Sequence, residues 1–445
     1  MNRVILIGNG FDKGIGLPTL YGDFMKWLID DIIKSVNIEI ENKKINITGF
    51  EEHVLSKIKE KAKYIDYDDN FIRINTIDFS HFNKELFFDK INNGVRYHSY
   101  SPDKDNFNDL KQITLHNQSE LNSINSKIVI KNIILSLLIK NYNTNSNWGN
   151  IEQIFYDELI KTSDNKIEKL NKDFSMFTNK LEEYLKTINI ESIINSKSKE
   201  YIDYIKENIY SNDLRPSYFC PIKIKEKLIE INCDLNKCNQ TTINDFYKRI
   251  GFKGFPTDGD FIEYFINEDK NLNILDDEFT IDNYLFLNFN YTNTPTYFTD
   301  ENEINFHINI HGDLTDNQSS PIIFGFGDEL DENYKILEDK NNNHFLKHIK
   351  SINYLKNNSY RKLIEFLESK HFQLFILGHS CGTSDRTLLN TVFEHDNCIS
   401  IVPFIRTDDD NYQDTIMNIY RNFTDKRKLR NRVVNKELCK NLTLD

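Results

Sequence analysis

Short apolar runs recur at the beginning and in the last third of the chain. Most of them end in or lead into glycine, asparagine or histidine. They cover residues 4–7, 284–290, 304–312, 321–327, 372–380 and 398–404. Runs of this length predict buried β-strands rather than helices. Helical stretches separate the later runs, and this alternation is typical of a parallel sheet. A helix is predicted for residues 19–36, with Pro18 and Thr19 at its start.

The pattern changes between these two regions. Polar helical stretches alternate there with short segments of alternating polarity, and residues 126–140 predict one apolar helix. Apolar residues between 167 and 188 repeat at spacings of three and four, which predicts either a helical hairpin packed inside the protein or a contact between two copies. We expect an α/β protein in which residues 1–36 and 281–445 form a Rossmann-like, mostly parallel sheet flanked by helices. A large, mainly helical insertion, residues 37–280, interrupts it.

Composition narrows the classes of function. The 445-residue chain carries a net charge of −13, and 13% of its residues are aromatic. The negative charge disfavours nucleic acid as a partner, because polyanions bind basic surfaces, and the aromatic content argues against disorder. No apolar run reaches the roughly 20 residues of a membrane span, and the first residues lack the pattern of a signal peptide. We expect a cytoplasmic protein without a membrane partner.

The cysteines and histidines form no recognisable metal-binding pattern. Cys233 and Cys238 have no matching second pair, and Cys220 stands alone, whereas zinc sites combine closely spaced pairs. His344 and His348 have the spacing of one helix face, but no carboxylate completes an H-E-x-x-H motif. We therefore expect no bound metal, and reduced cysteines that pack as small apolar side chains.

The first apolar run leads into a loop with four glycines. A glycine-rich turn between a strand and a helix lets backbone N–H groups approach a pyrophosphate. The loop departs from the dinucleotide fingerprint G-x-G-x-x-G, because Lys13 occupies the third glycine position, and no G-K-[ST] of a P-loop follows. The segment GNGFDKGIGLP resembles instead the sirtuin loop G-A-G-x-S-x-x-x-G-I-P, with four residues in register: Gly8, Gly10, Gly16 and Pro18.

Downstream segments extend this resemblance. Asn290 in N-F-N-Y-T takes the place of the asparagine in sirtuin Q-N-I-D, and His311-Gly312 resembles the sirtuin H-G. The chain is also similar to the phage abortive-infection family AbiH over residues 1–25 and 284–403. The segments that carry this similarity are ILIGNGFDKGIGLPTLYGDF, NFNYTNT, IIFGFGDE and ILGHSCGTSD, together with WGNIE at 148–152. The resemblances imply a sirtuin-like domain that binds NAD and cleaves it.

The resemblances also imply catalytic roles for Asn290 and His311. His311 ends a predicted strand, where residues of a parallel sheet face the ligand crevice, and histidine can accept a proton from a ribose hydroxyl or from water near neutral pH. Asn290 can hydrogen-bond a ribose hydroxyl or the attacking water. The alternatives are a histidine that only holds its loop and an asparagine that only makes a turn. Thr292 departs from the pattern, because sirtuins have aspartate there.

Further residues are expected to bind the nucleotide. Asp12 stands near a sirtuin serine, and we expect it to cap backbone N–H groups or to hold a ribose. Ser380 lies in GHSCG, which also matches the nucleophile elbow G-x-S-x-G of serine hydrolases, and Ser384 is expected to cap the next helix. Glu152 is expected either in the site or in the first turn of a helix. The expected binding residues are Gly8, Asn9, Gly10, Phe11, Asp12, Gly16, Pro18, Gly312, Gly378, His379, Ser380 and Asp385.

Two functions of different classes follow from these features. The first is an enzyme of phage defence that hydrolyses the nicotinamide–ribosyl bond of NAD and depletes the nucleotide. The second is a non-catalytic module that senses NAD or an ADP-ribose-like nucleotide and signals through the insertion. A sirtuin-type deacylase is disfavoured, because the four-cysteine zinc module of that family is missing. The expected partners are NAD, a phage-derived trigger and a second copy bound through the insertion.

Overall fold

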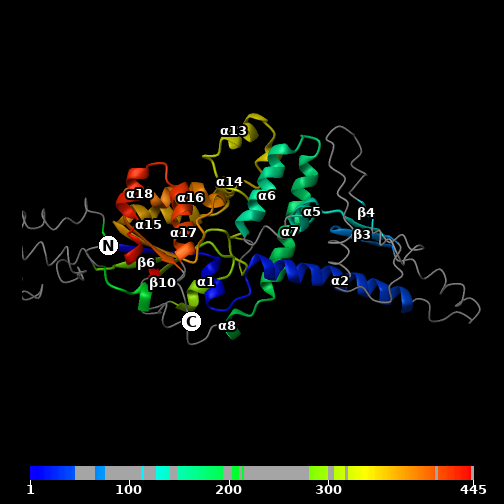
Figure 1. Ribbon diagram of the computed structural model, residues 1–445, viewed down its shortest axis with the longest axis horizontal. Helices are drawn as coiled ribbons and strands as arrows, with labels where there is room; N and C mark the ends of the chain where they lie inside the picture. Colours follow the sequence, from blue (N-terminus) through cyan, green and yellow to red (C-terminus); the bar gives the residue numbers. More distant parts are fainter. Residues whose placement is uncertain are drawn as a thin grey trace, which may run out of the picture. The chain divides into compact units, whose positions relative to one another are not determined.

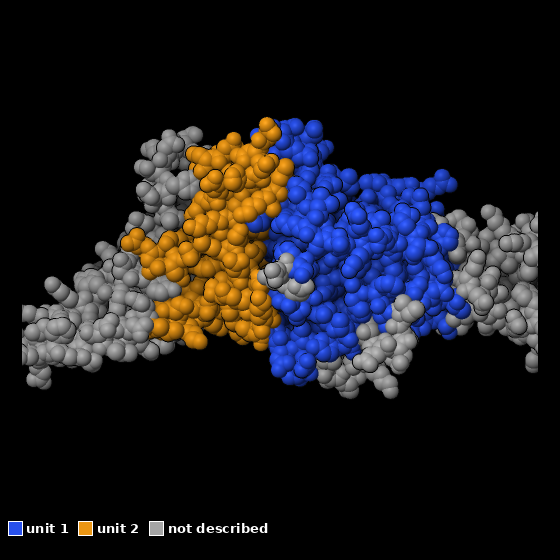
Figure 2. All heavy atoms as spheres, turned by 180° about the vertical axis from the view of Figure 1, so that it is seen from behind, with its two compact units in different colours: residues 1–19, 188–340, 348–445 blue, residues 20–187, 341–347 orange. Residues whose placement is uncertain are grey.

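The computed structural model describes both ends of the chain and parts of its middle (Figure 1). The described residues are 1–45, 66–75, 112–114, 127–140, 148–193, 203–209, 213–214, 280–298, 305–315, 319–405 and 409–441. The chain forms two compact units, coloured separately in Figure 2: unit 1 with residues 1–19, 188–340 and 348–445, and unit 2 with residues 20–187 and 341–347. The domain boundary predicted at residue 280 adjoins residues outside the described ones, so that division stays a prediction.

A six-stranded parallel sheet forms the centre of unit 1. Its strands are β1 (Asn2–Ile7), β6 (Asn283–Asn288), β7 (Asn305–Asn309), β8 (Phe372–Leu377), β9 (Cys398–Ile405) and β10 (Lys440–Asn441). Their order is β10-β9-β8-β1-β6-β7, and all neighbours run parallel. This corresponds to the order 3-2-1-4-5-6 of Rossmann folds, with β1 as the first strand. The predicted fold class is confirmed, and the N-terminal strand shares one sheet with the late strands.

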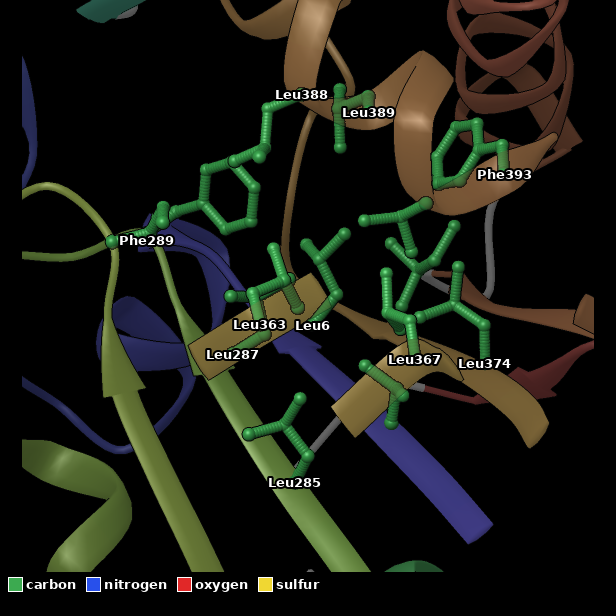
Figure 3. Close-up of a cluster of buried hydrophobic side chains, with 14 of the residues drawn as sticks. Leu6, Leu285, Leu287, Phe289, Leu363, Leu367, Leu374, Leu388, Leu389 and Phe393 are labelled. Carbon is green, nitrogen blue, oxygen red and sulfur yellow. The ribbon is translucent and has the colours of Figure 1, made fainter. Parts of the chain in front are cut away.

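The central strands are apolar on both faces because both faces are covered. Every residue of β1, β8 and β9 is buried, as is usual for parallel strands. Neighbouring residues of a strand point to opposite faces. Leu6 therefore joins one core cluster, whereas Ile5 joins the other. In the first cluster, shown in Figure 3, Leu6 packs with leucines of β6 and of helix α15 (Ser359–Ser369).

Short helices connect the strands of unit 1. They are α1 (Asn9–Gly14), α8 (Ile190–Ile193), α13 (Glu332–Asp339), α14 (Lys350–Asn353), α16 (Arg386–Phe393), α17 (Asp409–Asn422) and α18 (Lys426–Arg432), with the 3₁₀ turns η5 (Thr294–Phe298), η7 (Tyr354–Lys356), η8 (Thr383–Asp385) and η9 (Lys436–Leu438). The strand predicted for residues 321–327 is wrong, since its pairing is a single bridge from Phe326 to Ile349. Gly325 packs so closely on the His348 carbonyl that a Cβ would lie 1.9 Å from its oxygen. This segment therefore follows the loop before α14 instead of joining the sheet.

Unit 2 combines helices with a small antiparallel sheet. Its helices are α2 (Tyr21–Ile45), α5 (Ile133–Lys140), α6 (Trp148–Lys161) and α7 (Ile167–Lys186), with the 3₁₀ turn η6 (Asn343–Phe345). The sheet has the order β2-β3-β5-β4, from β2 (Asp66–Asp68), β3 (Ile72–Asn75), β5 (Lys127–Ile130) and β4 (Gln112–Thr114). The heptad seam lies on α7, and most of its apolar side chains are buried within the chain, as packing inside the protein requires. No helix of the described segments is long and apolar enough to cross a membrane.

The single helix predicted for residues 126–140 is wrong, because Asn132 ends a strand and begins a helix. Its side-chain oxygen accepts a hydrogen bond from the Leu135 backbone N–H (3.0 Å), as a residue at a helix N-terminus does. The carboxylate of Asp173, on α7, accepts from the Ile133 N–H (2.9 Å). Two of the N–H groups that a helix start leaves without partners are thereby satisfied, and the apolar run divides into β5 and α5.

A buried arginine fastens residues 203–209 to the sheet. Arg3, in β1, is fully buried and donates to the side-chain oxygen of Gln373 in β8 from Nε (3.1 Å) and Nη2 (2.7 Å). Its Nη1 donates to the backbone carbonyls of Ile205 (2.7 Å) and Glu207 (2.5 Å). Burial lowers the pKa of Arg3 to about 10, so the guanidinium is charged at neutral pH and its hydrogen bonds are charge-assisted.

Replacing Arg3 by methionine should lower the free energy of unfolding by about 3 kcal/mol, because Gln373 and two carbonyls lose a buried charged donor. Arg73→Met is the matched control. The Arg73 side chain is exposed, and its Nε lies 3.9 Å from Asp68, a surface pair worth at most about 1 kcal/mol. Urea denaturation followed by circular dichroism measures both variants, and equal losses would contradict the anchoring role of Arg3.

Candidate functional site

The residues expected in the site follow four adjacent strands at one edge of the sheet. Gly8 follows β1, Asn290 lies just after β6, His311 lies just after β7, and Gly378 follows β8. Because these strands are parallel neighbours, their carboxyl ends meet at the same edge. The direction of strand addition reverses between β1 and β8, the place where open α/β sheets bind ligands. The structure thus brings residues from both ends of the chain together.

The glycines after β1 and β8 allow two loops to touch. The N–H of Gly8 donates to the Leu377 carbonyl (3.0 Å), and the N–H of Gly10 donates to the Gly378 carbonyl (2.8 Å). A Cβ on Gly8 would lie 2.4 Å from the His379 Cα, and one on Gly10 would lie 2.7 Å from the Gly378 oxygen. Gly378 itself has a φ of +68°, which favours glycine. These two N–H groups therefore serve loop packing.

Other residues of the glycine loop have structural partners or lie at the surface. The Asn9 side chain bonds Thr19 twice, donating to its carbonyl (2.9 Å) and accepting from its hydroxyl (2.5 Å). Phe11 is fully buried in the core cluster on its side of the sheet. Gly16 and Pro18 are exposed, and Gly16 has a φ of +94°. These contacts within the chain give the loop a defined shape.

Asp12 is a buried carboxylate held by two threonine hydroxyls. Thr292 and Thr294 both donate to it, Thr294 at 2.7 Å. Within the described part of the chain, hydroxyls and not backbone N–H groups are its hydrogen-bond donors. Asp12 and Thr292, which are 280 residues apart in the sequence, are therefore direct partners. Burial raises the pKa of Asp12 to about 6, against the lowering effect of Thr292, Thr294 and Asn290.

Two asparagines after β6 have different roles. Asn288 is structural: its Nδ2 donates to the Thr292 carbonyl (2.7 Å) and to the Asn309 side chain (3.0 Å), and its Oδ1 accepts from the Asn290 N–H (3.0 Å). Asn290 is also buried, but its Nδ2 meets no acceptor at hydrogen-bond geometry among the described residues. This amide lies near enough to Asp12 to lower its pKa. Asn290 thus presents a buried donor beside a buried carboxylate.

His311 is buried with one ring nitrogen committed to the backbone. Its Nδ1 lies 3.0 Å from the Phe289 carbonyl oxygen, which can only accept, so Nδ1 carries a proton. Its Nε2 lies 3.2 Å from Oδ1 of Asp385 and 3.4 Å from the Tyr354 hydroxyl. Burial lowers the pKa of His311, Lys350 lowers it further, and Asp385 raises it. In the neutral ring, Nε2 is the proton acceptor.

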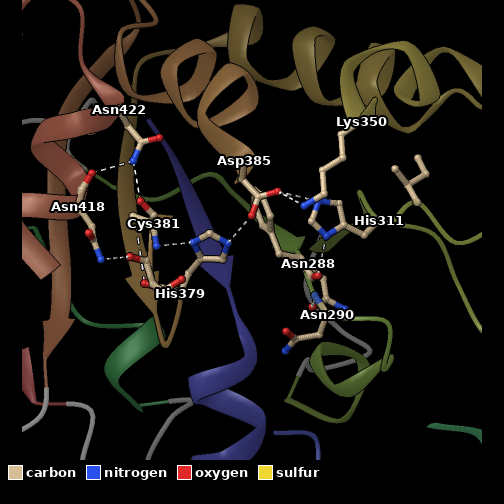
Figure 4. Close-up of polar contacts among 12 residues, drawn as sticks. Asn288, Asn290, His311, Lys350, His379, Cys381, Asp385, Asn418 and Asn422 are labelled. Carbon is tan, nitrogen blue, oxygen red and sulfur yellow. Dashed lines mark hydrogen bonds and ion pairs between the residues drawn. The ribbon is translucent and has the colours of Figure 1, made fainter. Parts of the chain in front are cut away.

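Asp385 joins three basic side chains at the centre of the cluster (Figure 4). Its Oδ1 accepts from Lys350 Nζ (2.7 Å), and its Oδ2 lies 3.6 Å from His379 Nε2. The His379 Nδ1 accepts from the Cys381 N–H (3.0 Å), so its Nε2 carries the proton that faces Asp385. Burial alone would raise the pKa of Asp385, but the Lys350 ammonium is the largest of the influences that hold it well below the usual range. Lys350 is buried too and is absent from the sequence prediction.

Helix α17 holds the loop that carries His379. Asn418 donates to the Ser380 carbonyl (2.9 Å), and Asn422 donates to the Cys381 carbonyl (2.7 Å). Neither asparagine stands out in the sequence, because an asparagine in a polar helix resembles any solvent-facing residue. Lys350 gives no signal either, since nothing in the surrounding sequence distinguishes it from the other lysines of this acidic chain.

Two alternatives for the loop after β8 do not match its geometry. A nucleophile elbow strains the serine itself, but the residue with positive φ (+52°) is Cys381, whereas Ser380 is exposed. Burial raises the pKa of the Cys381 thiol, which keeps it protonated. Ser384 does not cap α16, because it lies inside η8 and the N-cap position belongs to Asp385. The Asp385 side chain faces the basic cluster instead.

Glu152, Gly312 and the candidate metal ligands complete the residues considered from the sequence. Glu152 is buried on α6 in unit 2, so its contact with the site stays a prediction. Gly312 follows His311 with a φ of +95°, where a Cβ would lie 2.4 Å from the Pro321 carbonyl oxygen.

His344 and His348 do not share one helix, since η6 ends between them. In the described segments no three His, Cys, Asp or Glu side chains could hold a metal together; Cys220, Cys233 and Cys238 lie outside them.

Substituting Gly10 by alanine should destabilise the protein by about 1–3 kcal/mol, the usual effect of overpacking, because the new Cβ would press on the Gly378 carbonyl. Gly22→Ala provides the control, since nothing lies within 4 Å of a Cβ there and Gly22 is in helix α2. That variant should be neutral or gain up to about 1 kcal/mol. Thermal denaturation compares the two, and an unchanged melting temperature for Gly10→Ala would contradict the required loop contact.

Asp12 should make stability depend on pH. Its pKa of about 6 in the folded protein lies above the usual aspartate value of 3.8. The folded protein therefore holds this proton more tightly, and the resulting stabilisation is full below about pH 4 and is lost as the pH rises through 6. Asp12→Asn has no carboxylate to ionise and should not show this loss. Between pH 4 and pH 7 its free energy of unfolding should therefore rise by roughly 3 kcal/mol relative to that of wild type. Denaturation curves across this range, with the exposed Asp339→Asn as control, measure it; parallel profiles for Asp12→Asn and wild type would refute it.

Comparison with known proteins agrees with part of this interpretation. No curated protein and no solved structure matches the chain. The profile of one protein family matches residues 139–406. That span contains Asn290, His311, Lys350 and Asp385, whereas Asp12 and the glycine loop precede it. Because the match covers more than half of the 445 residues, the chain belongs to the family described as bacteriophage abortive infection AbiH.

Proposed function

We propose that this chain binds NAD at the carboxyl edge of its parallel sheet and hydrolyses the nicotinamide–ribosyl bond. Loss of NAD would stop the metabolism of an infected cell, which agrees with the abortive-infection description of the family. The Rossmann strand order supports a dinucleotide as the ligand. The resemblance of the glycine loop, Asn290 and His311 to sirtuins supports NAD among the dinucleotides.

The observation that carries the proposal is the buried amide of Asn290, which lies beside Asp12 and whose Nδ2 has no acceptor at normal hydrogen-bond geometry among the described residues. A buried N–H group without an acceptor costs roughly 1–3 kcal/mol, and such groups in folded proteins call for an explanation. A ribose hydroxyl can accept from Nδ2 and donate to Asp12 at the same time, because each carboxylate oxygen has a second lone pair beyond the one that a threonine uses. A ribose therefore satisfies both neighbours, whereas an apolar ligand would satisfy neither.

The charges around this position suit cleavage of a glycosidic bond. The electron pair of the bond leaves with nicotinamide, and positive charge develops on the ribose. Above pH 6 the Asp12 carboxylate is ionised, and its negative charge stabilises the positive charge that develops on the ribose. A water oxygen then bonds to the ribose carbon and gives a proton to Nε2 of His311. Burial keeps His311 neutral by lowering its pKa, so this nitrogen is able to accept the proton.

One observation favours the second function, a sensor without catalysis. Asp385, Lys350, His311 and His379 are all buried, and the three bases contact one carboxylate. A network of this kind also suits a rigid binding surface. A sensor needs the Asn290 amide to recognise its ligand but does not need a proton acceptor. Binding without nicotinamide release distinguishes it from the enzyme.

Asn290→Ala should abolish nicotinamide release and weaken NAD binding while lowering the melting temperature less than the control does, because among the described residues its Nδ2 has no acceptor at normal hydrogen-bond geometry. The neighbour Asn288→Ala is the matched control. It should lower the melting temperature clearly, since two donated bonds and one accepted bond disappear. Calorimetry with NAD and chromatographic detection of nicotinamide give the two readouts. Purified wild-type protein that does not bind NAD would overturn the proposal, and binding without release would establish the sensor.

A further inference from the structure

Two basic groups face the same carboxylate oxygen. Oδ1 of Asp385 accepts from Lys350 Nζ at 2.7 Å and lies 3.2 Å from Nε2 of His311. A protonated Nε2 would donate to this oxygen, whereas an unprotonated Nε2 presents a lone pair to it. The second arrangement is stable only if another cation balances the carboxylate. Lys350 occupies the place where such a cation is needed (Figure 4).

We infer that Lys350 keeps His311 in its neutral form, with the proton on Nδ1 and the lone pair on Nε2, by balancing Asp385. Lys350 is then a positioning residue for the proposed reaction, on which this inference rests. It does not touch the substrate. It sets the charge state of the group that receives the proton.

Among the groups that face His311, Lys350 and His379 favour its neutral form, whereas Asp385 favours the protonated form. Asp385 approaches from η8, Lys350 from α14, His379 from the loop after β8, and Tyr354 from η7. Asp385 and Lys350 cancel, so a proton on His311 would add a net positive charge to a buried cluster, which is costly. The Tyr354 hydroxyl, 3.4 Å from Nε2, can donate to the lone pair of the neutral ring. Without Lys350, Asp385 would instead stabilise an imidazolium.

The segment IIFGFGDE explains how Lys350 reaches this position. The Lys350 N–H donates to the Phe326 carbonyl (2.9 Å). A Cβ on Gly327 would lie 3.0 Å from the Lys350 Cβ and from the Ser384 carbonyl oxygen. The glycine thus lets the backbone that precedes α14 and the turn that carries Asp385 approach one another. A motif with no assigned role in the site thereby holds the lysine against the carboxylate.

Nitrogen-15 NMR of the histidine rings tests the inference without any substrate. In the wild-type protein the His311 signals, assigned by their loss in His311→Gln, should show the neutral Nδ1–H form between pH 6 and pH 8. Lys350→Gln keeps a donor to Asp385 but removes the charge, and it should raise the titration midpoint of His311 by one pH unit or more. Lys350→Arg should restore the wild-type spectrum, and Lys356→Gln, an exposed lysine on η7, should leave it unchanged.

The inference is overturned if wild-type His311 is an imidazolium at pH 7, or if folded Lys350→Gln titrates like wild type. If Lys350→Gln does not fold, the wild-type spectrum and Lys350→Arg still decide, since a neutral Nδ1–H ring in both supports the inference and an imidazolium in either refutes it. The pH profile of nicotinamide release gives a second readout. Its acidic limb should move to higher pH in Lys350→Gln by the shift that NMR measures. Absence of any release in wild type refutes the proposed enzyme alone, because the NMR result stands independently.

Discussion

The contact between the loops after β1 and β8 determines where the polar groups of the site lie. Gly8 and Gly10 press against Gly378 and His379 with no room for a Cβ, and two backbone hydrogen bonds join the loops. This contact places the His379 ring, which faces Asp385, and Asp385 in turn meets Lys350 and His311. The glycines that suggest a phosphate site in the sequence therefore first serve to bring two strand ends together.

The cost of burying charge shapes the rest of the site. Removing a carboxylate and an ammonium from water costs several kcal/mol for each ion, and their attraction recovers this only with good geometry. In the Asp385 cluster, one lysine and two histidines contact the buried carboxylate. Asp12 has hydroxyl donors and the Asn290 amide near it, and its raised pKa makes the charged form less populated near neutral pH. The two buried carboxylates differ in charge state near pH 6 because their neighbours differ. Such separated environments are common where proteins carry out acid–base chemistry.

Sequence patterns predict the sheet well because a strand that is buried on both faces is itself a continuous apolar run. The continuous apolar runs at β1, β8 and β9 and the polar residue at each strand end are local features, and they suffice for the fold class and for the edge where Asn290 and His311 lie. Lys350, Asn418 and Asn422 escape prediction because their importance comes from partners distant in sequence, at residues 385, 380 and 381. The error at residues 126–140 has the opposite origin. A single capping residue, Asn132, divides a mostly apolar segment into a strand and a helix.

The place of β1 in the sheet has a consequence during synthesis. This strand lies at residues 2–7, whereas its two neighbours in the sheet, at residues 283–288 and 372–377, are synthesised much later. At about 5–20 residues per second, roughly 20–70 s pass before both exist. During that interval an apolar strand, β1, has no sheet to join and is a natural client of chaperones. A chain that ends before residue 385 also cannot assemble the charge cluster, because Asp385 is the carboxylate that Lys350, His311 and His379 all face.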